Sequence, residues 1–256
     1  MDLELREKII ALFEYRQLPE LISFGWTKWD EDYYEKLINL QFHIYKLDHE
    51  LETNWEVDLS IINDRWEKIY DALDALDIPR KSHDSFCRHI YKYQKHELDI
   101  RKQKLPTRLS MEYFYFYKSC DVKLLRKIIY KNNPELSKAI KESQWRLFDL
   151  VTEINDDVED LQEDVSTING NRFLISLKQL GKSKTQKIYS DFLAEVADRN
   201  QLFTISFGNI DLNEWTRTQV AETLALLEEQ IKAFDFLNTS LYDRVVIRSL
   251  RAIKSL

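Results

Sequence analysis

The chain has 256 residues, of which only 4 are glycine and 4 are proline. Because sandwiches, barrels and doubly wound α/β folds need these residues at their many turns, the composition excludes most β-rich folds. The 37 basic and 44 acidic residues give a net charge of −7, which argues against a general nucleic-acid-binding protein with a wide basic face. We therefore predict an all-α fold, as one domain over residues 1–256.

The first residues of the chain, its apolar stretches and its cysteines indicate where in the cell the protein is expected. The first residues, MDLELREKII, include acidic side chains where a signal peptide would be basic, and no apolar stretch approaches the ~20 residues that a membrane span needs. Cys87 and Cys120 are too few for a disulfide framework. We expect a cytoplasmic protein with no stable membrane insertion.

Glycine, proline and helical periodicity divide the chain into segments of helix length. Helices are expected at about residues 2–18, 29–55, 58–76, 83–104, 109–131, 134–168, 173–200 and 211–253, the last one broken near Asn238. Segments of this length with short links predict a bundle of about eight or more long, mostly antiparallel helices.

The second of these segments carries a pair of carboxylates. Asp48 and Glu52 lie one turn apart and share a face with Gln41 and Tyr45, beside an apolar stripe. Both the edge of a cavity and an ordinary surface helix have such a face. A second, weaker acidic set lies in the next helix, at Asp71, Asp74 and Asp77.

Five consecutive aromatic residues, 113–117, cover every direction of the fifth predicted helix and indicate a centrally buried element. Lys118 shares a face with Phe114 and Tyr115, and Asp121 follows one turn later. Lys118 is therefore either half of a buried ion pair with Asp121 or a group that binds a ligand.

One face of the predicted helix 134–168 is a stripe of carboxylates, with apolar side chains on the opposite face. The stripe consists of Asp149, Glu153, Asp156, Asp160 and Asp164. Repulsion between these like charges costs on the order of 1–2 kcal/mol, and a bound Mg²⁺ would reverse its sign. The stripe is therefore either a solvated face or a metal-binding face. Trp145 lies on the acidic side, where it suits a pocket wall better than open solvent.

The sequence DDVED at residues 156–160, continued by Asp164, resembles the second aspartate-rich motif of class I isoprenoid synthases. This all-α superfamily comprises trans-prenyltransferases, squalene and phytoene synthases and terpene cyclases. Asp48 and Glu52 resemble the DxxxD motif of squalene and phytoene synthases, with Glu in place of the second Asp. The segment around Lys118 is similar to the prenyltransferase helix whose Lys-Thr pair contacts the diphosphate and the substrate chain. The separation between the two acidic motifs is shorter than is usual in the family.

The resemblance implies a bundle around a central cavity and a set of site residues. The implied Mg²⁺ ligands are Asp156, Asp160, Asp164, Asp48 and Glu52. The implied diphosphate-binding cations are Lys118, Arg108, which follows Pro106, and Arg172, which follows the sequence Asn-Gly-Asn after the acidic helix, with Arg244 from the C-terminal region. The aromatic side chains expected to enclose a carbocation are Trp145, Phe114 and Tyr115. Gly170, in the Asn-Gly-Asn sequence, is expected to cap the acidic helix.

The function implied is Mg²⁺-dependent ionisation of an allylic prenyl diphosphate, followed by prenyl transfer or cyclisation. A prenyl diphosphate is the expected partner, nucleic acid is not, and a homodimer is left open. The main alternative is a non-catalytic helical interaction protein, which the degenerate first motif favours. A di-metal carboxylate enzyme is a weaker alternative because the paired Glu-x-x-His motifs are absent. No HExxH, P-loop or nucleophile elbow occurs either.

Overall fold

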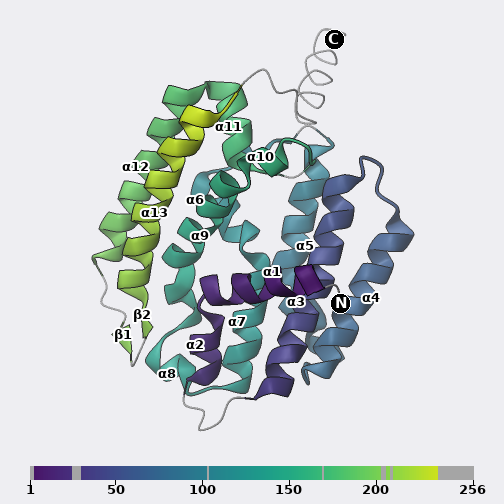
Figure 1. The fold of residues 1–256 in the computed structure, drawn as a ribbon. Coiled ribbons are helices and arrows are strands. Elements are labelled where there is room, and N and C mark those ends of the chain that lie inside the picture. Colours follow the sequence, from purple (N-terminus) through teal and green to yellow (C-terminus); the bar gives the residue numbers. More distant parts are fainter. Residues whose placement is uncertain are drawn as a thin grey trace.

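Helices account for most of the described residues, as Figure 1 shows. The computed structural model describes residues 3–24, 30–102, 104–168, 170–202, 206–207 and 210–235. Within these ranges the only strands are β1 (Ser206–Phe207) and β2 (Ile210–Asp211), which pair as a short antiparallel hairpin. The predicted all-α, single-domain fold is confirmed.

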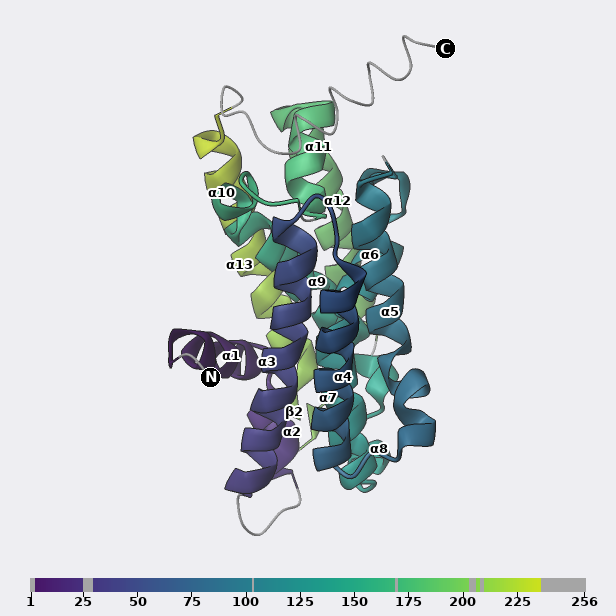
Figure 2. The ribbon, with the colours of Figure 1, turned by 90° about the vertical axis from the view of Figure 1, so that its right-hand side faces the viewer.

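The first half of the chain forms several helices on the right of Figure 1, and its first helix, α1, runs across the direction of the others. Its elements are α1 (Leu3–Tyr15), α2 (Leu18–Ser23), α3 (Glu31–Thr53), α4 (Leu59–Ala75), η1 (Arg80–Ser82), α5 (His83–Ile100), η2 (Pro106–Arg108), α6 (Met111–Lys118) and α7 (Cys120–Asn132). The side chain of Asp30 begins α3 by accepting a hydrogen bond from the backbone N–H of Tyr33 at 3.1 Å. Figure 2 shows that α1 projects sideways from the bundle formed by the other helices.

The second half surrounds the central helix α9. Its elements are α8 (Leu136–Ala139), η3 (Glu142–Trp145), α9 (Arg146–Glu159), α10 (Leu161–Asp164), α11 (Arg172–Leu180), α12 (Lys182–Asn200) and α13 (Leu212–Ala233). Helix α9 packs against α13, α6, α11 and α12. None of the helices in the described ranges combines the length and the apolar character that a membrane span requires.

Three predicted helices are divided in the structure. The segment 109–131 breaks at Ser119 between α6 and α7, and the segment 134–168 becomes α8, η3, α9 and α10. The segment 173–200 breaks at Gly181, whose φ of 78° lies in the left-handed region that ends helices and favours glycine. The last predicted helix is seen as α13 up to Ala233, and its expected break near Asn238 lies outside the described residues.

Two hydrophobic clusters form the interior, and α9 contributes to both of them. Its first turn places Phe148 in the cluster built mainly by α1 to α5 and α7. Its later turns place Leu150, Ile154 and Val158 in the cluster built by α6 and α10 to α13. The apolar face predicted for this helix is confirmed by the complete burial of these three side chains. The opposite, acidic face of α9 therefore lies where the two halves of the molecule meet.

Candidate functional site

The first half of the carboxylate stripe is buried and paired. Asp149 is 2% exposed and Glu153 is 4% exposed, so the solvated-face interpretation is wrong for these two residues. Asp149 forms an ion pair with Arg126 of α7, and both side chains are 3% exposed. The cation that compensates Asp149 thus comes from a different helix.

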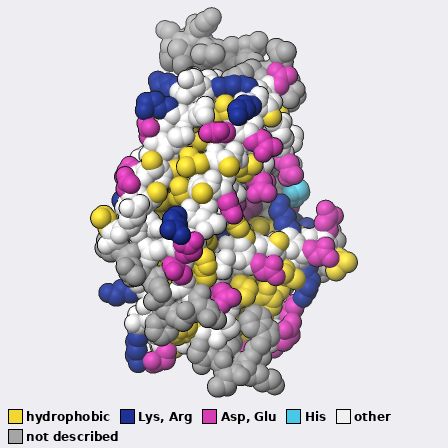
Figure 3. All heavy atoms as spheres, turned by 60° about the vertical axis from the view of Figure 1, so that its left-hand side comes forward, with side chains coloured by type: hydrophobic (Ala, Val, Ile, Leu, Met, Phe, Trp, Pro, Cys, Tyr) yellow, Lys and Arg dark blue, Asp and Glu magenta, His cyan; other side chains and the backbone are white. Residues whose placement is uncertain are grey.

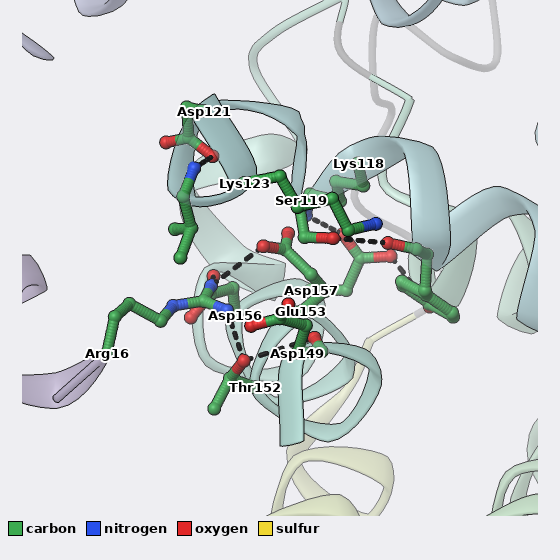
Figure 4. Close-up of polar contacts among 12 residues, drawn as sticks. Arg16, Lys118, Ser119, Asp121, Lys123, Asp149, Thr152, Glu153, Asp156 and Asp157 are labelled. Carbon is green, nitrogen blue, oxygen red and sulfur yellow. Dashed lines mark hydrogen bonds and ion pairs between the residues drawn. The ribbon is translucent and has the colours of Figure 1, made fainter. Parts of the chain in front are cut away.

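A second buried arginine, Arg16, neutralises the middle of the stripe. It lies at the turn between α1 and α2, is 1% exposed and points into the carboxylates from one side (Figure 4). Its guanidinium forms ion pairs with Glu153 at 2.9 Å and with Asp156, and it donates a hydrogen bond to the Thr152 hydroxyl. Burial alone would lower the pKa of Arg16, but Glu153 and Asp156 outweigh it and raise the pKa. Arg16 is therefore a permanent cation of this site.

Lys118 approaches the stripe from the side opposite Arg16 and pairs with Asp157 (Figure 4). Asp157 is fully buried, and its carboxylate also accepts hydrogen bonds from the Tyr115 hydroxyl at 2.9 Å and the Arg172 backbone N–H at 2.8 Å. The predicted pairing of Lys118 with Asp121 is wrong, because Asp121 instead accepts a hydrogen bond from Gln41 at 2.7 Å. The hydrogen bond from the Tyr115 hydroxyl thus holds the Asp157 carboxylate in place.

The two acidic motifs, about a hundred residues apart in the sequence, lie together in the structure. The backbone N–H of Ile168 donates a hydrogen bond of 2.8 Å to the carbonyl oxygen of Glu52, which ties the segment after α10 to the end of α3. The pKa of the Glu52 carboxyl is raised well above its usual value, first by burial and then by negative neighbours that include Asp48 and Asp164, while Lys118 opposes the rise.

Asp48 lies in the same electrostatic environment. Burial is the main cause that raises the pKa of its carboxyl well above the usual value, followed by the charges of Asp121, Glu97 and Glu153. Lys118 again acts in the opposite direction. The charge of Lys118 therefore lowers the pKa of carboxyl groups in both predicted motifs.

Asp160, directly after α9, completes this group. Burial raises the pKa of its carboxyl to about 6, Lys118 opposes the rise, and Asp164 and Asp156 add to it. Within the described ranges the side chains of Asp48, Glu52 and Asp160 form no hydrogen bond or ion pair. We call these three residues the unpaired carboxylates. Figure 3 shows acidic side chains gathered beside hydrophobic ones on one face of the molecule.

Asp164 is held by the loop that follows it. Its carboxylate accepts a hydrogen bond of 2.8 Å from the side chain of Asn171, which also donates to the carbonyl oxygen of Asp157 at 2.7 Å. The same Asn171 begins α11 by accepting from the Leu174 N–H at 2.8 Å. Asn171 therefore fixes the end of the stripe relative to α11, a role that was not predicted from the sequence.

Two of the other predicted cations form no hydrogen bond or ion pair with the unpaired carboxylates in the described part of the chain. The Arg172 guanidinium donates to the carbonyl oxygen of Leu109 at 3.1 Å, and the residue is 7% exposed. Arg108 ends η2 as an exposed residue, which is the arrangement of an ordinary surface residue at a helix start. Arg244 lies outside the described residues.

The aromatic residues predicted to line a cavity belong to the packed interior. Trp145 is fully buried, donates its indole N–H to the Tyr130 hydroxyl at 3.0 Å and lies under the Arg126 guanidinium. It precedes α9, at the opposite end of that helix from Asp160. Phe114 is 1% exposed and packs in the cluster around α9. An aromatic side chain influenced by the acidic group is that of Tyr45, whose pKa is raised by burial and then by Asp121, Asp156 and Asp48.

Glu97 of α5 is a further acidic residue of this site that the sequence analysis missed. It is 2% exposed, and burial raises the pKa of its carboxyl to about 7. A Cβ atom at Gly170 would lie 2.9 Å from its Oε1 atom, so the backbone at Gly170 approaches the Glu97 carboxylate closely. The prediction that Gly170 caps the acidic helix is wrong, because α10 already ends at Asp164.

In the described ranges, no three Asp, Glu, His or Cys side chains converge closely enough to hold one metal ion as they stand. Comparisons of the chain with protein-family models, with curated proteins and with solved structures gave no match. The functional argument therefore depends on the charges and contacts of the site.

Proposed function

We propose that the protein is a Mg²⁺-dependent enzyme of the class I isoprenoid type, which ionises an allylic prenyl diphosphate before prenyl transfer or cyclisation. One observation carries the proposal. The charge of one lysine, Lys118, acts on carboxylates of α3 and of the end of α9, which are distant in sequence, and three of these carboxylates have no partner within the described ranges.

The donor chemistry of the unpaired carboxylates fits Mg²⁺. Carboxylate oxygens are hard ligands, and Mg²⁺ binds to a few of them while it keeps water molecules that a phosphate group can replace. The raised pKa values of Asp48, Glu52 and Asp160 indicate that this region lacks positive charge, because a matching cation would lower them. Asp48, Glu52 and Asp160 would hold the ion, together with Asp164. Bound Mg²⁺ would neutralise charge on the leaving diphosphate.

Side chains of the protein would bind the diphosphate, stabilise positive charge and support the carboxylates. Lys118 is 21% exposed and reaches the boundary between the paired and unpaired carboxylates, where it can donate to a diphosphate oxygen. Tyr45 lies one turn before Asp48 on α3 and presents an aromatic ring near the acidic group, where it can stabilise positive charge. Arg16 holds Asp156 and Glu153 in fixed positions, so Asp156 acts as part of the support and not as a free ligand.

The non-catalytic alternative is favoured by a different observation. Asp149, Glu153, Asp156 and Asp157 are all ion-paired within the chain, so this part of the stripe needs no metal. A buried polar network of this kind can serve the fold alone. The two functions differ in what they require of the unpaired carboxylates.

Calorimetric titration of Mg²⁺ together with pyrophosphate, or with a non-hydrolysable farnesyl diphosphate analogue, tests the proposal. We expect binding by the wild type that depends on Mg²⁺, and a loss of at least about 10-fold in affinity for Asp160→Asn, because one charged ligand contact is removed. Release of diphosphate from farnesyl diphosphate would then be measured for both proteins.

Asp191→Asn is the matched control, because Asp191 is exposed and, among the described residues, pairs only with Lys187 on α12. It should bind like the wild type. The enzymatic proposal would be overturned if well-folded wild type failed to bind, and the site would be misplaced if Asp160→Asn bound as tightly as the control.

A further inference from the structure

A separate pocket of about 380 Å³ lies away from the unpaired carboxylates, between α5, α7 and the start of α9. Its lining comes from α5, α6, α7, η3 and α9, and consists of Ser85, Phe86, Arg88, His89, Phe116, Lys123, Leu124, Arg126, Lys127, Glu142, Ser143, Arg146 and Asp149. A volume of this size is typical of pockets that bind small molecules. Asp149 lines one wall and is already neutralised there by Arg126.

The pocket carries more positive than negative charge. Arg126 pairs with Asp149, and Arg146 pairs with Glu112 at 2.9 Å. The remaining charged groups of the lining are Arg88, Lys123 and Lys127 against the single carboxylate of Glu142. The pocket therefore has an excess of two positive charges, in a chain whose net charge is −7.

The two lysines are fixed in place but keep donor capacity. Lys127 donates to the carbonyl oxygen of Ser85 at 2.7 Å, and Lys123 donates to the carbonyl oxygen of Phe116. An ammonium group has three N–H donors, so each lysine can donate further hydrogen bonds. Arg88 is exposed at the rim and forms no hydrogen bond or ion pair within the described ranges.

Electrostatics supports the absence of a counter-ion. Burial lowers the pKa of Lys123 to about 8, and it lowers the pKa of His89 to about 4, with Lys123 and Arg88 adding to the effect on His89. His89 is therefore neutral near pH 7, while Lys123 stays mostly charged. An anion in this pocket would stabilise the charged form of Lys123.

One wall of the same pocket is apolar and aromatic. Lys123 lies over the Phe116 ring, 3.2 Å from its centroid, and Lys127 lies 4.2 Å from the centroid of the Phe86 ring. Leu124 closes the wall between the two lysines and is 2% exposed. The pocket thus places cations directly beside a surface that favours apolar groups.

We propose that this pocket is a second ligand site, which binds a phosphate monoester bearing an apolar or aromatic group. A phosphate monoester carries a charge of about −1.5 to −2 at pH 7, which matches the excess of two positive charges, whereas a carboxylate supplies only half of it. The apolar group would contact Phe86, Phe116 and Leu124. The site is independent of Mg²⁺ and of the proposed isoprenoid activity.

Calorimetric titration with phenyl phosphate in the presence of EDTA tests this site, because EDTA removes the divalent cations that the acidic site would need. We expect binding by the wild type and at least about a 10-fold weaker affinity for the double variant Arg88→Gln/Lys127→Gln, since two charge-assisted contacts are lost. Ser143→Trp, which fills the pocket from its exposed rim without changing charge, should also abolish binding.

Lys184→Gln/Lys187→Gln is the matched control, because it removes the same charge from exposed positions of α12. Circular dichroism melting curves verify that each variant is folded. The proposal is overturned by an absence of binding at millimolar phenyl phosphate, or by wild-type affinity in Ser143→Trp. Equal binding of benzoate would refute the assignment to a phosphate, and equal binding of inorganic phosphate would refute the apolar contact.

Discussion

The two halves of the acidic stripe have the same residue types at the same spacing but opposite surroundings. In the first half, Asp149, Glu153 and Asp156 are paired with Arg126 and Arg16 from other helices. In the second half, Asp160 has no side-chain partner within the described ranges, and the charge of Lys118 acts on it as it does on Asp48 and Glu52, which have none either. The same acidic face therefore begins with carboxylates that are ion-paired within the fold and continues to Asp160, which has no cationic partner in the described ranges.

This contrast teaches that helical periodicity identifies a face without identifying its role. The first half is needed for the fold, because a buried charge without a partner is costly. Asp160, in the second half, gains nothing for the fold from its charge, since burial and the neighbouring carboxylates oppose it. An unfavourable arrangement of this kind is typical of a site that is kept for a ligand.

The largest effect is expected from breaking the paired half. Arg126→Met leaves Asp149 buried and without its partner, so the free energy of unfolding should fall by about 3–5 kcal/mol. Urea denaturation followed by circular dichroism measures this change. The double variant Arg126→Met/Asp149→Leu removes both charges and should recover most of the loss.

The exposed pair of Arg217 and Glu214 on α13 gives the control for this experiment. Arg217→Met should change the free energy of unfolding by no more than about 1 kcal/mol, because solvent screens exposed pairs. A similar small loss for Arg126→Met would contradict the structural role given to the first half of the stripe.

A smaller effect of opposite sign is expected from the unpaired carboxylates. Asp48→Asn removes a charge that burial and neighbouring carboxylates disfavour, so without divalent cations the free energy of unfolding should rise by about 0.5–2 kcal/mol. Urea denaturation in EDTA measures the change, with Asp191→Asn as the control. A loss of stability in Asp48→Asn would show that this carboxylate supports the fold after all.

Much of the fold follows from the sequence, but not the breaks within the long helices. The apolar face of α9 was predicted because it depends only on helical spacing. The division between α6 and α7 at Ser119 was not predicted, because no glycine or proline marks it. The helix predicted over residues 173–200 is likewise interrupted at Gly181, whose positive φ ends α11.

The site was only partly predictable for a related reason. The carboxylates of the two motifs were identified from spacing within single helices, and the structure brings Glu52 and Asp164 into one electrostatic environment. The partners Arg16 and Arg126 come from helices whose position relative to α9 is a property of the tertiary structure. Glu97 likewise has no local pattern that distinguishes it from the polar residues around it on α5.

The smallest effect concerns pH. The pKa of Asp160 is raised to about 6 in the folded protein, so its carboxyl contributes stability below about pH 4 that is lost as the pH rises through 6. Subtracting the free energy of unfolding of Asp160→Asn from that of the wild type should therefore give a difference that falls between pH 4 and pH 6. We expect a change of less than about 1 kcal/mol, because Asp160 is partly exposed and solvent reduces the effect.

Urea denaturation at closely spaced pH values in EDTA measures this difference. Asp191→Asn, at an exposed ion pair, should show no comparable fall across the same interval. Because a bound cation favours the ionised carboxylate, repeating the series with Mg²⁺ and pyrophosphate should flatten or reverse the fall if Asp160 is a ligand. A fall that persists unchanged under those conditions would separate the two questions, because Asp160 would then be a strained carboxylate of the fold with no part in binding the metal.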